Sequence, residues 1–351
     1  MNASLIVNAA RGRGGSKGGR MRTELSLLGT FVAASLLASA SVQAQPVSLT
    51  IASGMTSEHS STKAMEIFKV EVARRSHNSI TIELAPNEQL GSAGELVQKL
   101  RADSIFALWA GAAFFARLVP EMEVVNLPFM FRNYDDALRT VNGPVGKFIE
   151  SKVDAKGFVL LAWLELGARN VANAKRPLTT VDDFKNLKIF TSPVETYQAT
   201  FRALGAVPMP ISTKEVYGAL RQGDIDGVDS PYTIMAGYKY YENMKYVSDT
   251  NHVLDLLVLV ANKKAFSRLT PEQQKTIKDV ARVTAIQQRK MMDDAEAAAF
   301  ASLKAAGQQF DHVPPATRVA MRKATAGVIN RVKMTVGADL VDKVIAEANR
   351  P

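Results

Sequence analysis

The spacing of apolar and polar residues along the chain predicts two α/β blocks in series. In the first block, apolar residues at helical spacing alternate with short strand-like runs, which is typical of βαβ units and a mainly parallel sheet. Strands are predicted at 47–52 and 80–84, helices at 62–75 and from 95 to 100, and buried apolar runs at 105–109 and 124–127.

The same alternation restarts at residue 158 and ends in long helices. Extended segments are predicted at 158–163, 187–190, 207–210, 225–228, 246–247 and 254–261, and helices at 194–204, 213–220, 271–306, 315–333 and 338–348. Ser212 and Glu215 suit the capping of a helix N-terminus, and Thr270-Pro271-Glu272 opens the longest helix in the same way.

The N-terminus has the pattern of a secretory leader. Arg20 and Arg22 precede a short apolar run at 25–38, and small residues follow it up to Ala44. We therefore expect cleavage after Ala44 and a protein exported to the periplasm, with residues 1–44 forming no part of the fold. Translation is expected to start at Met21. The alternative is an uncleaved N-terminal anchor, although the run is short for a membrane span.

Charge and composition narrow the function classes. The chain has 351 residues, a net charge of +9 and no cysteine. Five basic residues and one acidic residue lie in 1–44, so about half of the excess belongs to the predicted leader. No basic stripe with interleaved aromatic residues is present, so we expect no nucleic-acid partner. The missing thiols leave no disulfide and no thiolate metal site.

The usual signatures of catalysis and cofactor binding are absent from residues 45–351. The four histidines lack ligand spacing, and this part of the chain has no HExxH, GxSxG, GxGxxG or P-loop pattern. We therefore expect no metal, no cofactor, no catalytic residue and no enzymatic activity.

Several segments in fixed order resemble the solute-binding proteins of tripartite ATP-independent periplasmic (TRAP) transporters, of the DctP type. The likeness runs from about Leu49 to Ala306. Its stretches are Gln89-Leu90-Gly91, Asn126-Leu127-Pro128-Phe129, Trp163 to Gly167 with Arg169, Asn173-Ala174-Lys175-Arg176-Pro177, Asp183-Phe184-Lys185-Asn186-Leu187, Glu215-Val216-Tyr217-Gly218-Ala219-Leu220, Gly223-Asp224-Ile225-Asp226-Gly227 and Thr250-Asn251-His252.

This resemblance implies a two-domain α/β fold of the periplasmic-binding-protein (flytrap) type, with the long helix 271–306 spanning both domains. Domain I is predicted at 45–166 plus about 256–290, and domain II at 167–255 plus about 291–351. It also implies that the protein captures a small organic acid between the domains and delivers it to membrane permease subunits.

The resemblance places a carboxylate-binding arginine at Arg169, where a planar fork of donors matches a carboxylate. The alternative for Arg169 is a structural ion pair with an aspartate. The family's second arginine is replaced by Phe190, and its Glu-Asn pair by Asp229-Ser230. We therefore expect a monocarboxylate with an apolar or aromatic part.

The remaining candidates are residues whose chemistry suits a pocket of this kind. Phe190, Trp109 and Phe106 are candidate walls, although Phe106 and Trp109 equally suit the core of a buried strand. Tyr232, Ser230, Thr213 and His59 are candidate polar contacts. Two other functions remain open, namely a periplasmic sensor for a small solute and a secreted enzyme on the same scaffold.

Overall fold

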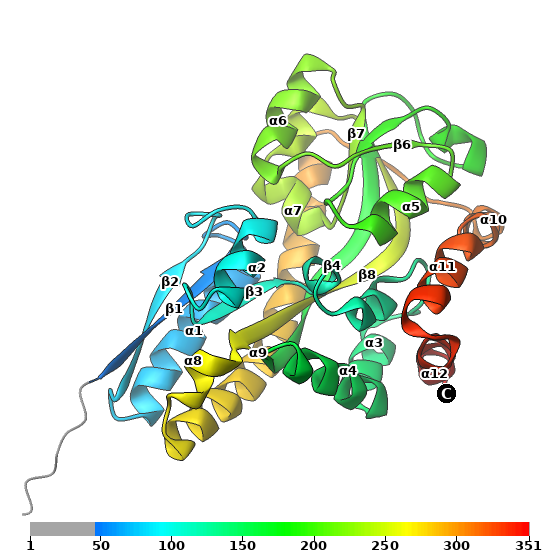
Figure 1. The fold of residues 1–351 in the computed structure, drawn as a ribbon. Helices are drawn as coiled ribbons and strands as arrows, with labels where there is room; N and C mark the ends of the chain where they lie inside the picture. The colour runs from blue at the N-terminus through cyan, green and yellow to red at the C-terminus, as the bar shows by residue number, and fades with distance from the viewer. Residues whose placement is uncertain (1–45, 351) are drawn as a thin grey trace, which may run out of the picture. The chain divides into compact units, whose positions relative to one another are not determined.

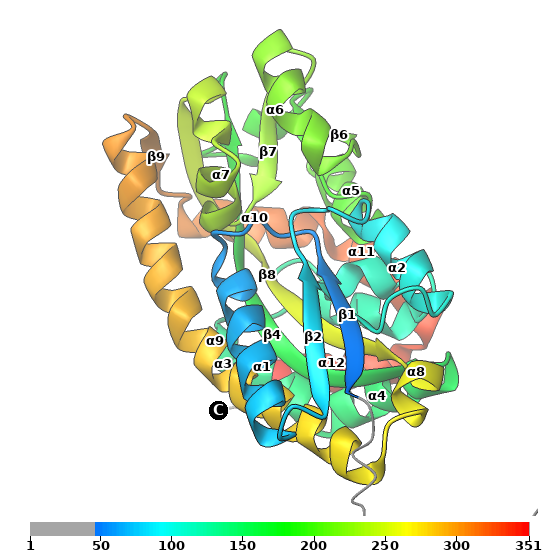
Figure 2. The ribbon, with the colours of Figure 1, turned by 90° about the vertical axis from the view of Figure 1, so that its left-hand side faces the viewer.

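The computed structural model describes residues 46–350, which belong to one compact unit. The predicted leader and its cleavage site after Ala44 lie outside the described residues. The fold is the predicted two-domain α/β architecture, built on one sheet with helices packed around it (Figures 1 and 2).

Nine strands form this sheet, in the order β2-β1-β3-β8-β4-β7-β5-β6, with β9 paired to β8. The strands are β1 Val47–Ser53, β2 Ile80–Ala85, β3 Ala107–Gly111, β4 Phe158–Asn173, β5 Lys188–Phe190, β6 Val207–Met209, β7 Gly227–Ser230, β8 Tyr246–Asn262 and β9 Gln309–Asp311. We call β2, β1 and β3 the first strand group, and β7, β5 and β6 the second strand group.

Two long antiparallel strands connect the two strand groups. β4 and β8 pair along nearly their whole lengths, with register shifts that include those at Glu165/Gly167 and Arg169/Val171. β3 joins β8 near its C-terminal end, through Leu257–Ala261, whereas β7 joins β4 near its C-terminal end, through Asn170–Asn173. Each long strand therefore belongs to both halves of the sheet.

Most strand pairs are parallel, as expected, and β8–β9 is one of them, but the pairs at the centre of the sheet are antiparallel. Within each strand group the pairs are parallel, as the βαβ pattern predicts. The pairs β3–β8, β4–β8 and β4–β7 are antiparallel. The reason is that the chain crosses between the halves twice, in opposite directions, and the two crossing strands are neighbours.

Helices cover the sheet. They are α1 Ser60–Arg75, α2 Ala93–Arg101, α3 Tyr134–Asn142, α4 Pro144–Ala155, α5 Glu195–Ala203, α6 Thr213–Gln222, α7 Tyr232–Gly237, α8 Lys263–Ser267, α9 Pro271–Ala305, α10 Pro315–Ala324, α11 Ala326–Val336 and α12 Ala338–Ala348, with 3₁₀ turns η1 Ala112–Phe115, η2 Pro120–Asn126, η3 Val181–Phe184 and η4 Tyr240–Asn243. α9 packs on α1, on β4 and on α7, so it runs alongside both halves of the sheet.

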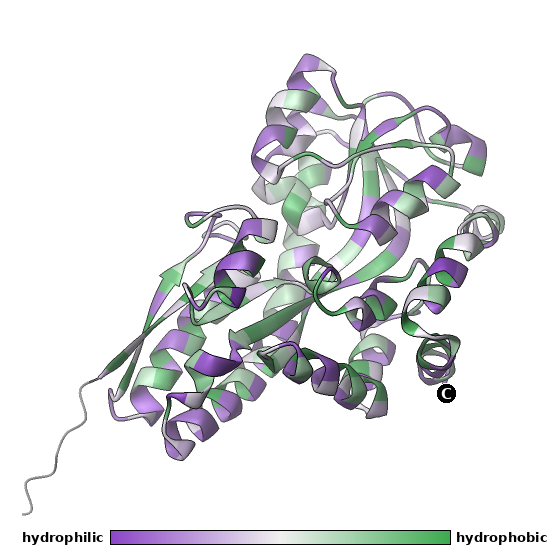
Figure 3. Cartoon of the chain, in the orientation of Figure 1, coloured by the Kyte–Doolittle hydropathy of each residue, from purple (hydrophilic) through white to green (hydrophobic). Residues whose placement is uncertain are grey.

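Burial follows the hydropathy of the strands. The C-terminal half of β8, from Leu256 to Ala261, is fully buried between helices, and Figure 3 shows it as a hydrophobic strand among helices with hydrophilic outer faces. α12 contributes Leu340, Val341 and Val344 to a core cluster that includes Val141 of α3. The predicted boundaries assign α12 to domain II, but its apolar face packs on α3 of the predicted domain I. The other boundaries stay predictions.

Several predicted elements differ from the structure. The run 124–127 is buried as expected and lies mostly in η2, whereas α3 and α4 were not predicted. Residues 246–247 and 254–261 are parts of the single strand β8, and the helix expected at 315–333 is interrupted at Thr325. Short apolar runs do not distinguish a strand from a buried turn, and polar residues interrupted the β8 pattern.

Candidate functional site

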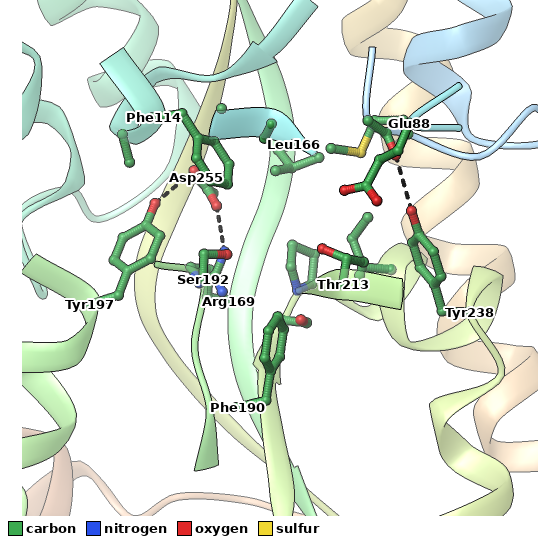
Figure 4. A pocket seen from close by; sticks show the side chains of 18 residues that line it. Glu88, Phe114, Leu166, Arg169, Phe190, Ser192, Tyr197, Thr213, Tyr238 and Asp255 are labelled. Carbon is green, nitrogen blue, oxygen red and sulfur yellow. Dashed lines mark hydrogen bonds and ion pairs between the residues drawn. The ribbon is translucent and has the colours of Figure 1, made fainter. Parts of the chain in front are cut away.

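A cavity lies where the C-terminal ends of strands from both groups meet. The empty space of this cavity, counted together with the part that is open to solvent, is about 630 Å³. The first strand group and the segments after it supply Gly54, Met55, Glu88, Ala93, Gly111, Ala113 and Phe114. The second supplies Phe190, Ser192, Tyr197, Thr213, Ser230, Pro231, Ile234 and Tyr238, and the long strands supply Leu166, Arg169 and Asp255 (Figure 4). Strand C-termini are where open α/β sheets bind ligands.

Arg169 of β4 is the charged centre of this cavity. Its Nε donates to Asp229 Oδ1 at 2.8 Å, its Nη1 to Asp255 Oδ2 at 2.7 Å, and its Nη2 to the Asp229 carbonyl oxygen at 2.6 Å. Arg169 as a whole is 3% exposed, and its Cζ atom lies 4.4 Å from the centre of the Tyr197 ring. A guanidinium has five N–H groups, so one N–H on each terminal nitrogen has no partner among residues 46–350.

The local backbone of β4 aims Arg169 at its partners. Gly167 has a φ of +121°, and a Cβ atom there would meet Glu296 Oε1 at 2.6 Å and Pro231 Cβ at 2.8 Å. Only glycine fits this conformation and this close approach. The register shifts on both sides of Gly167 and Arg169 bend the strand, as bulges do next to binding sites.

The two aspartates beside Arg169 have opposite pKa shifts. Burial raises the pKa of Asp255, and this outweighs the effect of Arg169. Burial acts in the same sense on Asp229, but Arg169 and His252 outweigh it and lower the pKa of Asp229. His252 Nε2 lies 3.1 Å from Asp229 Oδ1, and the Tyr197 hydroxyl donates to Asp255 Oδ1 at 3.0 Å. One acid is therefore held ionised, and the other binds a proton more readily.

Contacts between the halves close one side of the cavity. The hydroxyl of Tyr238, the residue that follows α7, donates to the Gly54 carbonyl oxygen at 3.0 Å, and Lys214 Nζ of α6 donates to the Glu88 carbonyl oxygen at 3.2 Å. The Glu88 side chain is buried, and its Oε2 has no hydrogen-bond partner among the described residues. Burial raises the pKa of Glu88, and Lys214 opposes this shift.

No set of three or more histidine, cysteine or acidic side chains is placed to hold a metal ion anywhere in residues 46–350. Over the same residues, no helix is both long enough and apolar enough to span a membrane.

Comparison with known proteins decides the family. The model of the DctP family, bacterial extracellular solute-binding protein family 7, matches residues 51–334. The chain belongs to this family. Its resemblance to the TRAP-transporter solute-binding proteins is thereby confirmed. Proteins of this family bind solutes for transport and are periplasmic.

Several similar proteins are named or described by the sugar acid that they bind. The 2,3-diketo-L-gulonate-binding periplasmic protein YiaO of Escherichia coli is 32% identical over 244 residues, covering 70% of this chain and 74% of that protein. A TRAP solute-binding protein of Roseobacter denitrificans with bound β-D-glucuronate has a TM-score of 0.83 at 25% identity, covering 86% of this chain and 99% of that chain. The sugar acid binding protein of Advenella mimigardefordensis in complex with galactonate has a TM-score of 0.83 at 27% identity, covering 87% and 98%.

Four of the residues predicted for the solute site line the cavity. They are Arg169, Phe190, Ser230 and Thr213. Asp229 does not line the cavity but pairs with Arg169 behind it. The structural ion pair considered for Arg169 is therefore present, and Arg169 also faces the cavity.

The other four predicted residues lie elsewhere, which corrects the expected wall and polar contacts. Phe106 and Trp109 are buried in the core cluster with Phe266 and Leu259, because their side chains point away from the cavity. Tyr232 packs against Phe300 and Phe310. His59 is buried at the start of α1, where it caps the helix by accepting from the Ser61 N–H.

Sequence reasoning missed several lining residues, among them Phe114, Tyr197, Asp255, Glu88 and Tyr238. A signal existed for Asp255, since an acidic residue within the apolar run 254–261 needs a buried cation. Glu88 directly precedes Gln89-Leu90-Gly91, a stretch that carries the family resemblance. Tyr197 lies on the predicted helix α5 and Tyr238 directly follows the short helix α7, and neither position has a distinguishing pattern in the sequence.

Proposed function

We propose that this protein binds a sugar acid, a small monocarboxylate bearing several hydroxyl groups, with its carboxylate at Arg169. The observation that carries this proposal is the pair of N–H groups on the terminal nitrogens of Arg169 that the described residues leave without a partner. Because Arg169 lines the cavity, these N–H groups are available as charged donors to a ligand carboxylate. The sugar acids bound by the similar proteins support this choice.

The walls of the cavity suit the rest of such a ligand. Phe114, Leu166 and Phe190 offer apolar surface for the C–H faces of a carbon chain or ring. Ser192, Thr213 and Ser230 offer hydroxyl groups that donate to, and accept from, the hydroxyls of a sugar acid. The sugar acids named for the similar proteins carry no separate apolar or aromatic group, so the ligand proposed here differs from the one expected from Phe190.

Binding of an anion requires a change in charge beside Arg169. Two ionised aspartates, Asp229 and Asp255, already exceed the single positive charge of the guanidinium, so a ligand carboxylate adds a further negative charge to a buried cluster. Asp255 is the group that compensates for this added charge by binding a proton, because its pKa is already raised by burial. We propose that a proton enters with the ligand and is held on Asp255.

The wider role follows from the family. We propose that the leader at residues 1–44 directs the chain to the periplasm and is removed there, and that the loaded protein delivers its ligand to TRAP permease subunits. Closure of the two halves around the ligand is the change that such subunits would recognise.

Thermal unfolding of the purified protein with matched acids and neutral compounds tests the ligand class. Glucuronate and galactonate are compared with glucose and galactitol, which have similar hydroxyls but no carboxylate. A ligand at about a hundredfold excess over its Kd stabilises by about 2.7 kcal/mol, a readily visible shift. Shifts with the neutral compounds alone would overturn the role of Arg169.

A further inference from the structure

We infer that Glu88 is a second ligand-binding group, which accepts hydrogen bonds from hydroxyls at the end of the ligand remote from its carboxylate and excludes a second carboxylate there. This inference rests on the proposed function, since it assumes that the ligand carboxylate lies at Arg169. It adds a basis for selecting monocarboxylates over dicarboxylates.

The Glu88 carboxylate is buried without being satisfied. Its side chain is 6% exposed, and Oε2 has no hydrogen-bond partner among residues 46–350. The nearest cation is Lys214, whose Nζ lies 3.8 Å from Oε2, beyond hydrogen-bond distance. Lys214 is 61% exposed in its side chain, so water screens its charge. A buried acceptor without a partner is costly, and a ligand that donates to it removes that cost.

The chain holds Glu88 in an unfavourable backbone conformation that directs it into the cavity. Asn87 and Glu88 have φ values of 54° and 52°, and the Gln89 N–H donates to the Pro86 carbonyl oxygen across this turn. Asparagine tolerates the left-handed region, but glutamate is uncommon there. The Glu88 N–H also donates to the Ser53 carbonyl oxygen, which ties the turn to the end of β1.

Glu88 and Arg169 lie on different sides of the cavity. Figure 4 shows the Glu88 carboxylate entering from the segment after β2, while Arg169 enters from β4 on the other side of Thr213. A ligand with its carboxylate at Arg169 therefore presents its other end to Glu88. An ionised carboxylate only accepts hydrogen bonds, so this end must carry hydroxyl or N–H donors.

The same chemistry excludes a second carboxylate. Two carboxylates brought together in a buried site repel each other. An ionised carboxylate at this end of the ligand also has no N–H or O–H group to donate a hydrogen bond to Glu88. Lys214 is too exposed to neutralise both. The site should therefore prefer an acid that ends in a hydroxymethyl group over one that ends in a carboxylate.

Two matched pairs of acids test this selectivity. Galactonate and galactarate, like gluconate and glucarate, differ only in the terminal carbon, which is a hydroxymethyl group in one and a carboxylate in the other. Isothermal titration of the purified protein measures the Kd of all four. We expect at least one hydroxymethyl acid to bind about tenfold or more tightly than its dicarboxylate partner, the factor expected for a hydrogen bond to a charged group.

Glu88→Gln identifies the residue responsible. The amide keeps the shape, removes the charge and donates to a carboxylate, so the preference should fall by about tenfold. Glu83→Gln is the matched control, because Glu83 is an exposed residue of β2 that does not line the cavity. This control should leave the preference unchanged. Thermal unfolding shows whether each variant is folded. The selectivity itself is measured on the unaltered protein, so this part of the test does not depend on any variant.

The outcomes separate the two proposals. If the hydroxymethyl acids bind but the dicarboxylates bind equally well, or Glu88→Gln leaves the preference intact, the role of Glu88 is wrong and the proposed function stands. If none of the four acids binds while neutral sugars do, the proposed function is wrong, and so is the role of Glu88.

Discussion

Arg169 Nη1 and Asp255 Oδ2 lie 2.7 Å apart, although 86 residues separate them in the chain. The antiparallel pairing of β4 with β8 brings them together, since Gly167 pairs with Asp255 and Arg169 pairs with Val253. Arg169 and Asp255 are therefore diagonal neighbours on the two long strands that connect the halves. Asp229, which pairs with Val171, approaches Arg169 from β7 on the opposite side of β4.

Replacing Arg169 should abolish ligand binding and destabilise the fold. Arg169→Met leaves two buried carboxylates without their cation, and breaking a buried ion pair in this way costs about 3–5 kcal/mol. Urea unfolding measures the free energy of unfolding, and isothermal titration measures binding.

A triple variant separates binding from stability. Arg169→Met combined with Asp229→Asn and Asp255→Asn removes all three charges, so most of the stability should return while binding stays lost. Normal sugar-acid binding by Arg169→Met would show that the carboxylate site lies elsewhere.

Binding of a sugar acid should become weaker as pH rises. The pKa of Asp255 is raised by burial, and an anionic ligand at Arg169 raises it further, so the complex holds a proton that the free protein holds less firmly. Proton uptake favours binding at low pH, as long as the ligand carboxylate stays ionised. Titration in two buffers of different ionisation enthalpy counts this proton. Asp255→Asn should bind with no proton uptake, and an unchanged uptake in this variant would assign the proton to another group.

Phe190 should contribute apolar contact and not charge. Phe190→Leu keeps most of the side-chain volume but removes the aromatic face from the cavity, so the Kd for a sugar acid should rise severalfold, the equivalent of about 0.5–1.5 kcal/mol. Phe148→Leu is the matched control, because Phe148 is 42% exposed and does not line the cavity. Equal affinities in the two variants would remove Phe190 from the ligand site.

Glu296 should make the fold less stable at alkaline pH. Burial raises its pKa to about 7. Between its ordinary value and about 7 the folded chain holds a proton that the unfolded chain releases, so this contribution to stability falls as pH rises and levels off above about 7. At pH 8, Glu296→Gln should therefore unfold at a higher temperature than the unaltered protein. The corresponding gain in the free energy of unfolding is on the order of 1–2 kcal/mol after allowance for solvent screening.

At pH 4 the two proteins should differ little, because Glu296 is then protonated in both states of the chain or nearly so. Thermal unfolding across this pH range provides the measurement. Equal unfolding temperatures at pH 8 would contradict the raised pKa.

The amino-acid sequence alone was sufficient to predict the protein family and the main elements of its fold. Periodicity located the helix that begins at Pro271 and the helix α12, because caps and apolar spacing act within a few residues. The family resemblance, and not periodicity, predicted Arg169 and Phe190 for the solute site, and both line the cavity.

Which side chains meet around the cavity followed only from the tertiary contacts. Asp255 reaches Arg169 through strand pairing, and Glu88 reaches the cavity through a left-handed turn, and neither relationship leaves a local pattern in the chain. Trp109 and Phe190 are both aromatic residues of strands, yet one is in the core and the other lines the cavity. Which face of a strand points to the cavity depends on sheet register and crossing, and these arise from contacts between residues far apart in the sequence.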